Sequence, residues 1–301
     1  MSVLTITNKK GQPVELPAFV PGSLIDTHTH LGMQEDPALR IARAATAGAG
    51  TLITICDPGE QLEPEGRHID EVALTYDSIA SWQEQARVLL DAGGYGDLPT
   101  PELHVIIGLH PHHARFWSPE VEARIRERAA DQRTVGLGEM GLDYHYDYSP
   151  REAQREVFAA ELRLAHELDL PVCLHLREAH DDGLRILREV GVPPRGAVLH
   201  CFNLDYEVAV PFVELGCVLG FDGPLTFKKA DEVRAAAARA PEGKIIVETD
   251  APFMAPEPLR GMTCEPAHVA FIAARLAEVR GVTPDEIAAQ TTACARELFG
   301  L

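Results

Sequence analysis

Eight short apolar runs recur along the chain, and longer helical patterns separate them. The runs are continuous rather than alternating, which is typical of strands buried on both faces of a parallel sheet. The expected strands cover residues 24–28, 51–56, 104–110, 134–139, 171–176, 197–202, 217–222 and 244–250. Strands that are each followed by a helix predict an α/β fold, a (β/α)8 TIM barrel, here with an extra C-terminal helix over residues 283–300.

A doubly wound parallel sheet is the alternative arrangement of such a pattern. The segment DTHTHLG argues against it, because it follows the first strand where a dinucleotide-binding sheet carries its glycine fingerprint. Helix starts are marked by a hydroxyl residue followed by proline at residues 118–119, 149–150 and 283–284.

The chain length of 301 residues fits one barrel, so a single domain is expected over residues 1–301. The connection over residues 57–100 is long for a link between a strand and a helix. Its first part is polar and rich in Pro and Gly, which predicts an excursion or lid, and a helix is expected over residues 77–93.

The balance of charges is strongly acidic, with 27 basic and 46 acidic residues and a formal net charge of −19. This disfavours non-specific adsorption to nucleic acid or to anionic lipid. It leaves a phosphate-bearing substrate open, because bound divalent cations can reverse the field of an acidic pocket. No secretory signal, long apolar run or C-x-x-C pair is visible among the residues, so a cytoplasmic protein with six buried thiols, no membrane contact and no obligate protein partner is expected.

Imidazole and carboxylate side chains fall at the ends of five of the predicted strands. The carboxyl ends of barrel strands meet on one face, where active sites form. Six ionisable groups crowded together are costly unless a cation orders them. A metal centre is therefore predicted from His28, His30, Glu139, His175, His200 and Asp250.

Each position has its own chemical reason and its own structural alternative. In a strand, His28 and His30 point to the same face and can hold one ion together, with Asp26 expected to orient an imidazole. Glu139 lies between glycines that allow close backbone approach, which suits a carboxylate bridging two ions. Asp250 can bind the first ion and take a proton from the attacking water. The alternatives are buried structural histidines, a hydrogen-bonded Glu and an Asp that caps a turn.

The mixed ligand set indicates which cations to expect. Imidazole with carboxylate suits zinc, manganese, iron or cobalt better than calcium. Magnesium keeps more water and fewer histidines, but it stays open as an alternative. One or two divalent ions are therefore the expected cofactors.

Nine segments in order resemble the TatD-like metal-dependent hydrolases, the TatD deoxyribonuclease family of the amidohydrolase superfamily. They are IDTHTHL, GLHPHHA, GLGEMGLDYH, PVCLHLREA, LHCFN, GFDGPLTFKKA, IVETDAPFMAP, CEPAHV and TTACARELFG. The resemblance implies a TIM barrel with a one- or two-metal centre. It implies that one ion is held by His28, His30 and Asp250, the other by His175 and His200, and that Glu139 bridges them.

The resemblance also implies hydrolysis of an ester bond, typically a phosphodiester at DNA ends. His110 and His112 then match the histidine segment beside the substrate phosphate, with Arg177 or Lys228 as further anion-binding groups. Packing roles for the histidines, a solvated helix start for the lysine and a pair between Arg177 and Glu178 are the alternatives.

Three departures from the family pattern bear on the substrate. They are Asn203-Leu204-Asp205 in place of a small Ser/Gly stretch, Cys294 in place of an Asn, and the long 57–100 connection. All three are expected in loops that shape the pocket rather than among the ligands. An amidase, lactonase or small phosphoesterase on the same centre is thus the second hypothesis, and a binding module without activity is the third. Glu139 favours the TatD-like side over relatives that use a carboxylated lysine.

Overall fold

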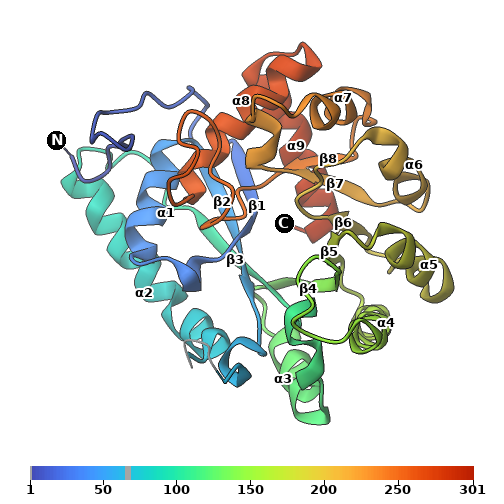
Figure 1. Cartoon of the computed structure of the whole chain (residues 1–301). Coiled ribbons are helices and arrows are strands. Elements are labelled where there is room, and N and C mark those ends of the chain that lie inside the picture. The colour runs from blue at the N-terminus through green and yellow to red at the C-terminus, as the bar shows by residue number, and fades with distance from the viewer. Residues whose placement is uncertain (1, 65–68) are drawn as a thin grey trace.

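The computed structural model describes residues 2–64 and 69–301, and it contains an eight-stranded parallel sheet whose strands follow one another in chain order (Figure 1). The strands are β1 (Leu24–Thr29), β2 (Ala49–Cys56), β3 (Glu102–Ile107), β4 (Thr134–Asp143), β5 (Val172–Arg177), β6 (Ala197–Leu199), β7 (Val218–Phe221) and β8 (Ile245–Val247). The longer helices are α1 (Pro37–Thr46), α2 (Glu71–Ala92), α3 (Pro119–Ala129), α4 (Arg151–Leu168), α5 (His180–Val190), α6 (Tyr206–Glu214), α7 (Asp231–Arg239), α8 (Val269–Arg280) and α9 (Pro284–Phe299). Single 3-10 turns are η1 (Leu31–Met33), η2 (Glu60–Leu62), η3 (Pro111–Phe116), η4 (Gly223–Thr226) and η5 (Pro266–His268). The predicted TIM barrel with its extra C-terminal helix is confirmed.

The sheet curls until β1 meets the segment that follows β8. A parallel bridge joins Thr29 to Ala251. The amide of Asp250 donates to the carbonyl of His28 at 2.9 Å, and the amide of His30 donates to that of Ala251 at 2.7 Å. The barrel is therefore closed by the segment that follows β8 rather than by β8 itself.

The additional helix α9 covers the end of the barrel at which the strands begin. Its Leu298 and Phe299 belong to one buried cluster with interior residues such as Ile25 and Ile246. Cys294 belongs to the same cluster, and its thiol donates to the carbonyl of Gly243 at 3.1 Å. The expectation that Cys294 shapes the substrate pocket is wrong, because this residue lies at the opposite end of the barrel from the carboxyl ends of the strands.

Two of the three predicted hydroxyl–proline helix starts are confirmed. Ser118 caps α3 by accepting from the amide of Val121, and Thr283 forms a reciprocal capping box with Glu286. Ser149 is the exception, because its hydroxyl donates to the carbonyl of His112 at 2.6 Å instead of capping α4.

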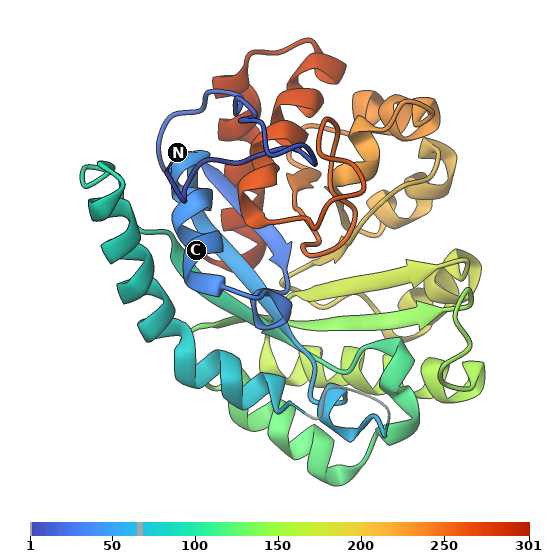
Figure 2. The same ribbon diagram turned by 60° about the vertical axis from the view of Figure 1, so that its left-hand side comes forward.

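The 57–100 connection contains the helix that covers the barrel between β2 and β3. Helix α2 begins at Glu71, six residues before the predicted start at residue 77, because Asp70 caps it by accepting from the amide of Ala73. It lies beside α1 on the outside of the barrel (Figure 2). Residues 65–68 of the expected excursion lie outside the described residues.

Five of the six cysteines are buried, one is half-buried, and all six are free thiols. Within the described parts of the chain, no helix is both long enough and apolar enough to cross a bilayer.

Candidate metal centre

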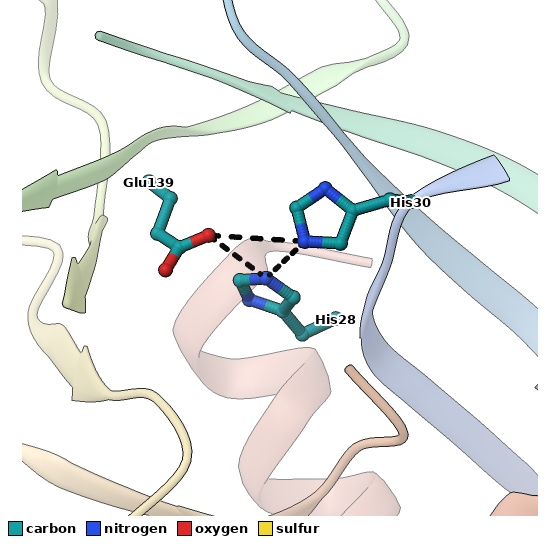
Figure 3. Close-up of side chains that lie close together, drawn as sticks. All are labelled: His28, His30 and Glu139. Atoms are coloured by element: carbon teal, nitrogen blue, oxygen red, sulfur yellow. Dashed lines mark hydrogen bonds and ion pairs between the residues drawn. The ribbon is translucent and has the colours of Figure 1, made fainter. Parts of the chain in front are cut away.

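Four predicted ligands form one compact group at the carboxyl ends of the strands. His28 Nε2 lies 3.3 Å from His30 Nε2 and 3.2 Å from Glu139 Oε2 (Figure 3). Asp250 Oδ1 lies 3.5 Å from His30 Nε2 and 3.8 Å from His28 Nε2. His28 and His30 therefore lie between two carboxylates, and each imidazole is within 3.9 Å of both of them.

The other predicted ligands gather around the second oxygen of the same carboxylate. His175 Nδ1 lies 2.5 Å from Glu139 Oε1, and His200 Nε2 lies 3.6 Å from it. His110 Nε2 lies 3.6 Å from this oxygen as well. Glu139 thus faces imidazoles with both of its oxygens, and His110 lies in the second group with His175 and His200. The two groups adjoin each other, because the rings of His28 and His200 are stacked with centroids 3.7 Å apart and His200 Nε2 lies 3.8 Å from Asp250 Oδ1.

The spacing of these atoms fits cations better than direct hydrogen bonds. Two ligands that each lie about 2.1 Å from a tetrahedral ion are about 3.4 Å apart. The distances within the first group run from 3.2 to 3.9 Å, and most of them exceed good hydrogen-bond lengths. Imidazole and carboxylate are also the donor types that zinc and its neighbours prefer. The residues present therefore fit a divalent metal centre.

Glu139 lies inside a strand rather than at its end, because β4 continues to Asp143. The register between β4 and β5 shifts between Leu137 and Met140, and such a bulge re-aims a side chain. Gly138 has φ +136°, and a Cβ there would lie 2.5 Å from the carbonyl oxygen of Cys173. The close approach expected for the glycines beside Glu139 is therefore observed at Gly138.

The remaining donors also depart from the predicted strand ends. His175 lies two residues before the end of β5, and His200 directly follows β6. Asp250 lies three residues beyond β8 and has a left-handed φ of 53°. The last strands are shorter than predicted because their backbones turn toward the site before the apolar runs end.

The carboxylates and imidazoles of the group shift one another's pKa values. Burial raises the pKa of Glu139, but the histidines around it outweigh burial and hold that pKa well below its ordinary value. Burial lowers the pKa of His175, yet Glu139 and Asp143 together raise it to about 9. These shifts keep Glu139 ionised beside the imidazoles, and binding of a divalent cation there would release any proton that an imidazole carries.

Two buried carboxylates that were not predicted hold the imidazoles in place. Asp143 Oδ2 lies 3.1 Å from His175 Nε2 and 2.9 Å from His112 Nε2. Glu248 Oε1 lies 3.0 Å from His200 Nδ1. Each lies in a quoted motif, GLGEMGLDYH or IVETDAPF, but its spacing from a predicted ligand does not by itself show that it faces an imidazole.

Asp26 does not orient an imidazole, and that expectation is wrong. Its carboxyl accepts from the amide of Thr249 at 2.8 Å and lies 2.7 Å from the Thr249 hydroxyl. Its contact with His28 is to the backbone amide, at 3.4 Å. Asp26 therefore fixes the segment that carries Asp250 against β1.

Arg177 is exposed, and its guanidinium lies over the ring of Tyr146, 4.7 Å from the centroid. The alternative pair with Glu178 is not observed, because Glu178 Oε1 lies 2.7 Å from His145 Nδ1. Lys228 and Lys229 are exposed before α7, which agrees with the alternative that these lysines form a solvated helix start. In the Asn203–Asp205 departure, Asp205 caps α6 by accepting from two backbone amides.

The connection between β2 and β3 brings a further buried acid toward the site. Glu71 is 2% exposed, and one of its oxygens has no hydrogen-bond partner. Burial, with the charges of Asp57 and Glu60 adding to it and His30 opposing it, raises the pKa of Glu71 to about 7.

We expect Glu71→Gln to stabilise the protein at about pH 8 by about 2–3 kcal/mol and to have little effect near pH 4.5. The folded carboxyl, with its pKa of about 7, binds a proton more tightly than the unfolded one, with its ordinary value of 4.5. Stability is therefore lost as pH rises between these values, and the neutral amide avoids this loss. Urea unfolding of both proteins at the two pH values measures it, and an equal difference at both would contradict it.

Comparison with known proteins agrees with this site and fold. Residues 25–300 match the family model described as TatD related DNase. The chain is 40% identical over 197 residues to the uncharacterized metal-dependent hydrolase YabD of Bacillus subtilis, covering 65% of this chain and 77% of YabD. It is 38% identical over 199 residues to the 3'-5' ssDNA/RNA exonuclease TatD of Erwinia amylovora, covering 64% of this chain and 77% of that protein. The crystal structure of YJJV, a TatD homolog from Escherichia coli K12, matches with a TM-score of 0.76 and 28% identity over 94% of this chain and all of that one.

The match runs from the first strand to the last helix, and it includes every segment that holds a candidate ligand. The resemblance predicted from the motifs is confirmed. The chain belongs to the TatD-related DNase family of metal-dependent hydrolases.

Proposed function

We propose that this protein hydrolyses phosphodiester bonds in single-stranded nucleic acid at a centre of two divalent cations. The observation that carries the proposal is the arrangement around Glu139, whose two oxygens each face a separate group of imidazoles. The family description and the name of the Erwinia amylovora relative support the nucleic-acid substrate.

The ligand roles follow from the distances. One cation would be held by His28, His30 and Asp250 and the other by His175, His200 and His110, and Glu139 lies between these two groups. When bound, divalent cations of this kind acidify water and offset the negative charge of a phosphoryl oxygen. Zinc, manganese, iron or cobalt suits these donors, and magnesium stays an alternative.

The remaining side chains of the site handle the proton and the substrate. Asp250 Oδ1 is the proposed acceptor of the proton that the attacking water loses. Its carboxyl is buried, and although burial raises its pKa, nearby histidines lower it below its ordinary value, so that it is ionised. Asp143 fixes His112 beside His175, and the charge of Arg177 is available to a substrate phosphate. The free thiols support a reducing compartment, and we propose the cytoplasm.

Removal of metal is expected to reduce cleavage of a single-stranded oligonucleotide by at least about a thousandfold, because the cations supply several kcal/mol of charge stabilisation. The protein is treated with a chelator, dialysed free of it and assayed before and after each candidate cation is added back. Undiminished activity after complete removal would rule out the centre. Cleavage of small esters or lactones without cleavage of the oligonucleotide would replace the nuclease with the amidohydrolase-type alternative.

A further inference from the structure

Two exposed tyrosine rings lie parallel in the connection between β4 and α4. Tyr146 and Tyr148 are 39% and 58% exposed, and their planes differ by 3° with centroids 5.4 Å apart. Large rings that remain exposed together, instead of joining the core, mark a surface that binds something. The guanidinium of Arg177 lies over the Tyr146 ring, and within residues 2–64 and 69–301 it has no carboxylate partner.

This aromatic pair adjoins the candidate metal centre. The rings of His112 and Tyr148 are nearly perpendicular, with centroids 4.8 Å apart. The centroid of the His112 ring also lies 4.2 Å from that of His110. His110 in turn faces Glu139 at 3.6 Å. Two ring contacts therefore separate Tyr148 from the candidate ligand His110.

The segment that carries the tyrosines is held in place before any ligand binds. Asp143 Oδ1 accepts from the amide of Tyr146 at 2.9 Å, and its other oxygen lies beside His112 and His175. The guanidinium of Arg115 donates to the carbonyl of Tyr148, so this backbone is also tied to η3. A preformed aromatic surface loses little conformational entropy when a flat ligand stacks on it.

We propose that Tyr148, supported by Tyr146, is a stacking platform for an unpaired nucleobase of the strand whose phosphodiester lies at the metal centre. This inference rests on the proposed function. It adds to that function the part of the substrate that the protein recognises, an unpaired nucleobase. Stacking on an aromatic side chain is tolerant of sequence, because every base has a π-face. Inside a duplex both faces of a base are covered by its neighbours, and a terminal base is held by its pair, so the platform favours an unpaired strand end. Arg177 then lies where it can bind an adjoining phosphate of the same strand.

The activity test compares a natural single-stranded oligonucleotide with one that carries an abasic residue at the terminal position. Tyr148→Ala is expected to lower kcat/KM on the natural strand about tenfold, and Tyr148→Phe is expected to keep it, because only the ring is needed. On the abasic strand the wild type and Tyr148→Ala should cleave equally. Tyr95→Ala serves as the matched control, since Tyr95 is a 41% exposed tyrosine in the loop after α2.

A binding measurement separates this inference from the proposed function. The strand carries 2-aminopurine at its end, a chelator prevents cleavage, and stacking is followed as fluorescence quenching. Quenching by the wild type and Tyr148→Phe, but not by Tyr148→Ala, supports the platform. The platform is overturned if Tyr148→Ala lowers kcat/KM equally on the natural and abasic strands, or if Tyr148→Ala quenches 2-aminopurine as strongly as the wild type. Neither result would contradict the proposed nuclease activity. If the wild type cleaves neither strand with any added metal, the proposed function itself fails.

Discussion

Glu139→Gln is expected to lower kcat/KM by about a thousandfold or more and to weaken binding of both cations. The carboxylate presents Oε2 to His28 at 3.2 Å and Oε1 to His200 at 3.6 Å, so that one side chain serves both groups. Glutamine has nearly the same volume, but its NH2 group cannot bind a cation and its charge is zero. The measurement is steady-state cleavage of a single-stranded oligonucleotide, together with the metal content of the purified variant.

The matched control is Glu161→Gln. Glu161 is as deeply buried as Glu139, and its Oε1 accepts from the amide of Leu109 at 2.7 Å. Burial raises the pKa of Glu161 well above its ordinary value, which favours the neutral acid, and the amide resembles that form closely. Its activity should stay within about twofold of wild type. A Glu139→Gln protein that keeps a tenth of its activity and its full metal content would show that this carboxylate bridges nothing.

Asp26→Ala should lower the free energy of unfolding by about 3–4 kcal/mol, whereas Asp26→Asn should change it by less than about 1 kcal/mol. Asp26 is fully buried, and alanine would leave the amide of Thr249 without a partner and would remove the shortest hydrogen bond of its hydroxyl. Burial raises the pKa of Asp26 to about 8, so the native group is mostly a neutral acid at neutral pH. Asparagine can accept from the Thr249 amide and donate to its hydroxyl in the same way.

Urea unfolding of the metal-depleted proteins measures this difference without any contribution from bound cations. Asp26→Ala should also bind metal more weakly, because Thr249 directly precedes Asp250. Similar losses of stability in the alanine and asparagine variants would mean that charge, rather than hydrogen bonding, explains why an acid lies at this position.

The strand pattern predicted the barrel because apolar content is a local property of each run. The positions of the six predicted ligands followed from it, because the carboxyl ends of all the strands of a barrel meet on one face. The position of Glu139 within β4 was not predictable in the same way. It depends on a bulge and on a strand that continues through the polar residue Asp143, neither of which an apolar run records.

The roles of the acids that neighbour the predicted ligands could not be predicted from the strand pattern either. Asp26 and Glu248 both lie two residues before a predicted ligand, so spacing alone treats them alike. In the structure one of them binds backbone and a threonine, whereas the other faces an imidazole. Which of these occurs depends on how two distant strands meet, and that is a tertiary property.

The meeting of the first strand with the segment after β8 gives the metal centre a second consequence. His28 and His30 come from one side of that junction and Asp250 from the other, with more than two hundred residues of chain between them. All three side chains can hold one cation only while the two ends of the sheet are in contact. The binding energy of such a cation would therefore add to the stability of that contact. It would behave as a removable cross-link between the two ends of the barrel, and its loss would let the barrel open there more often.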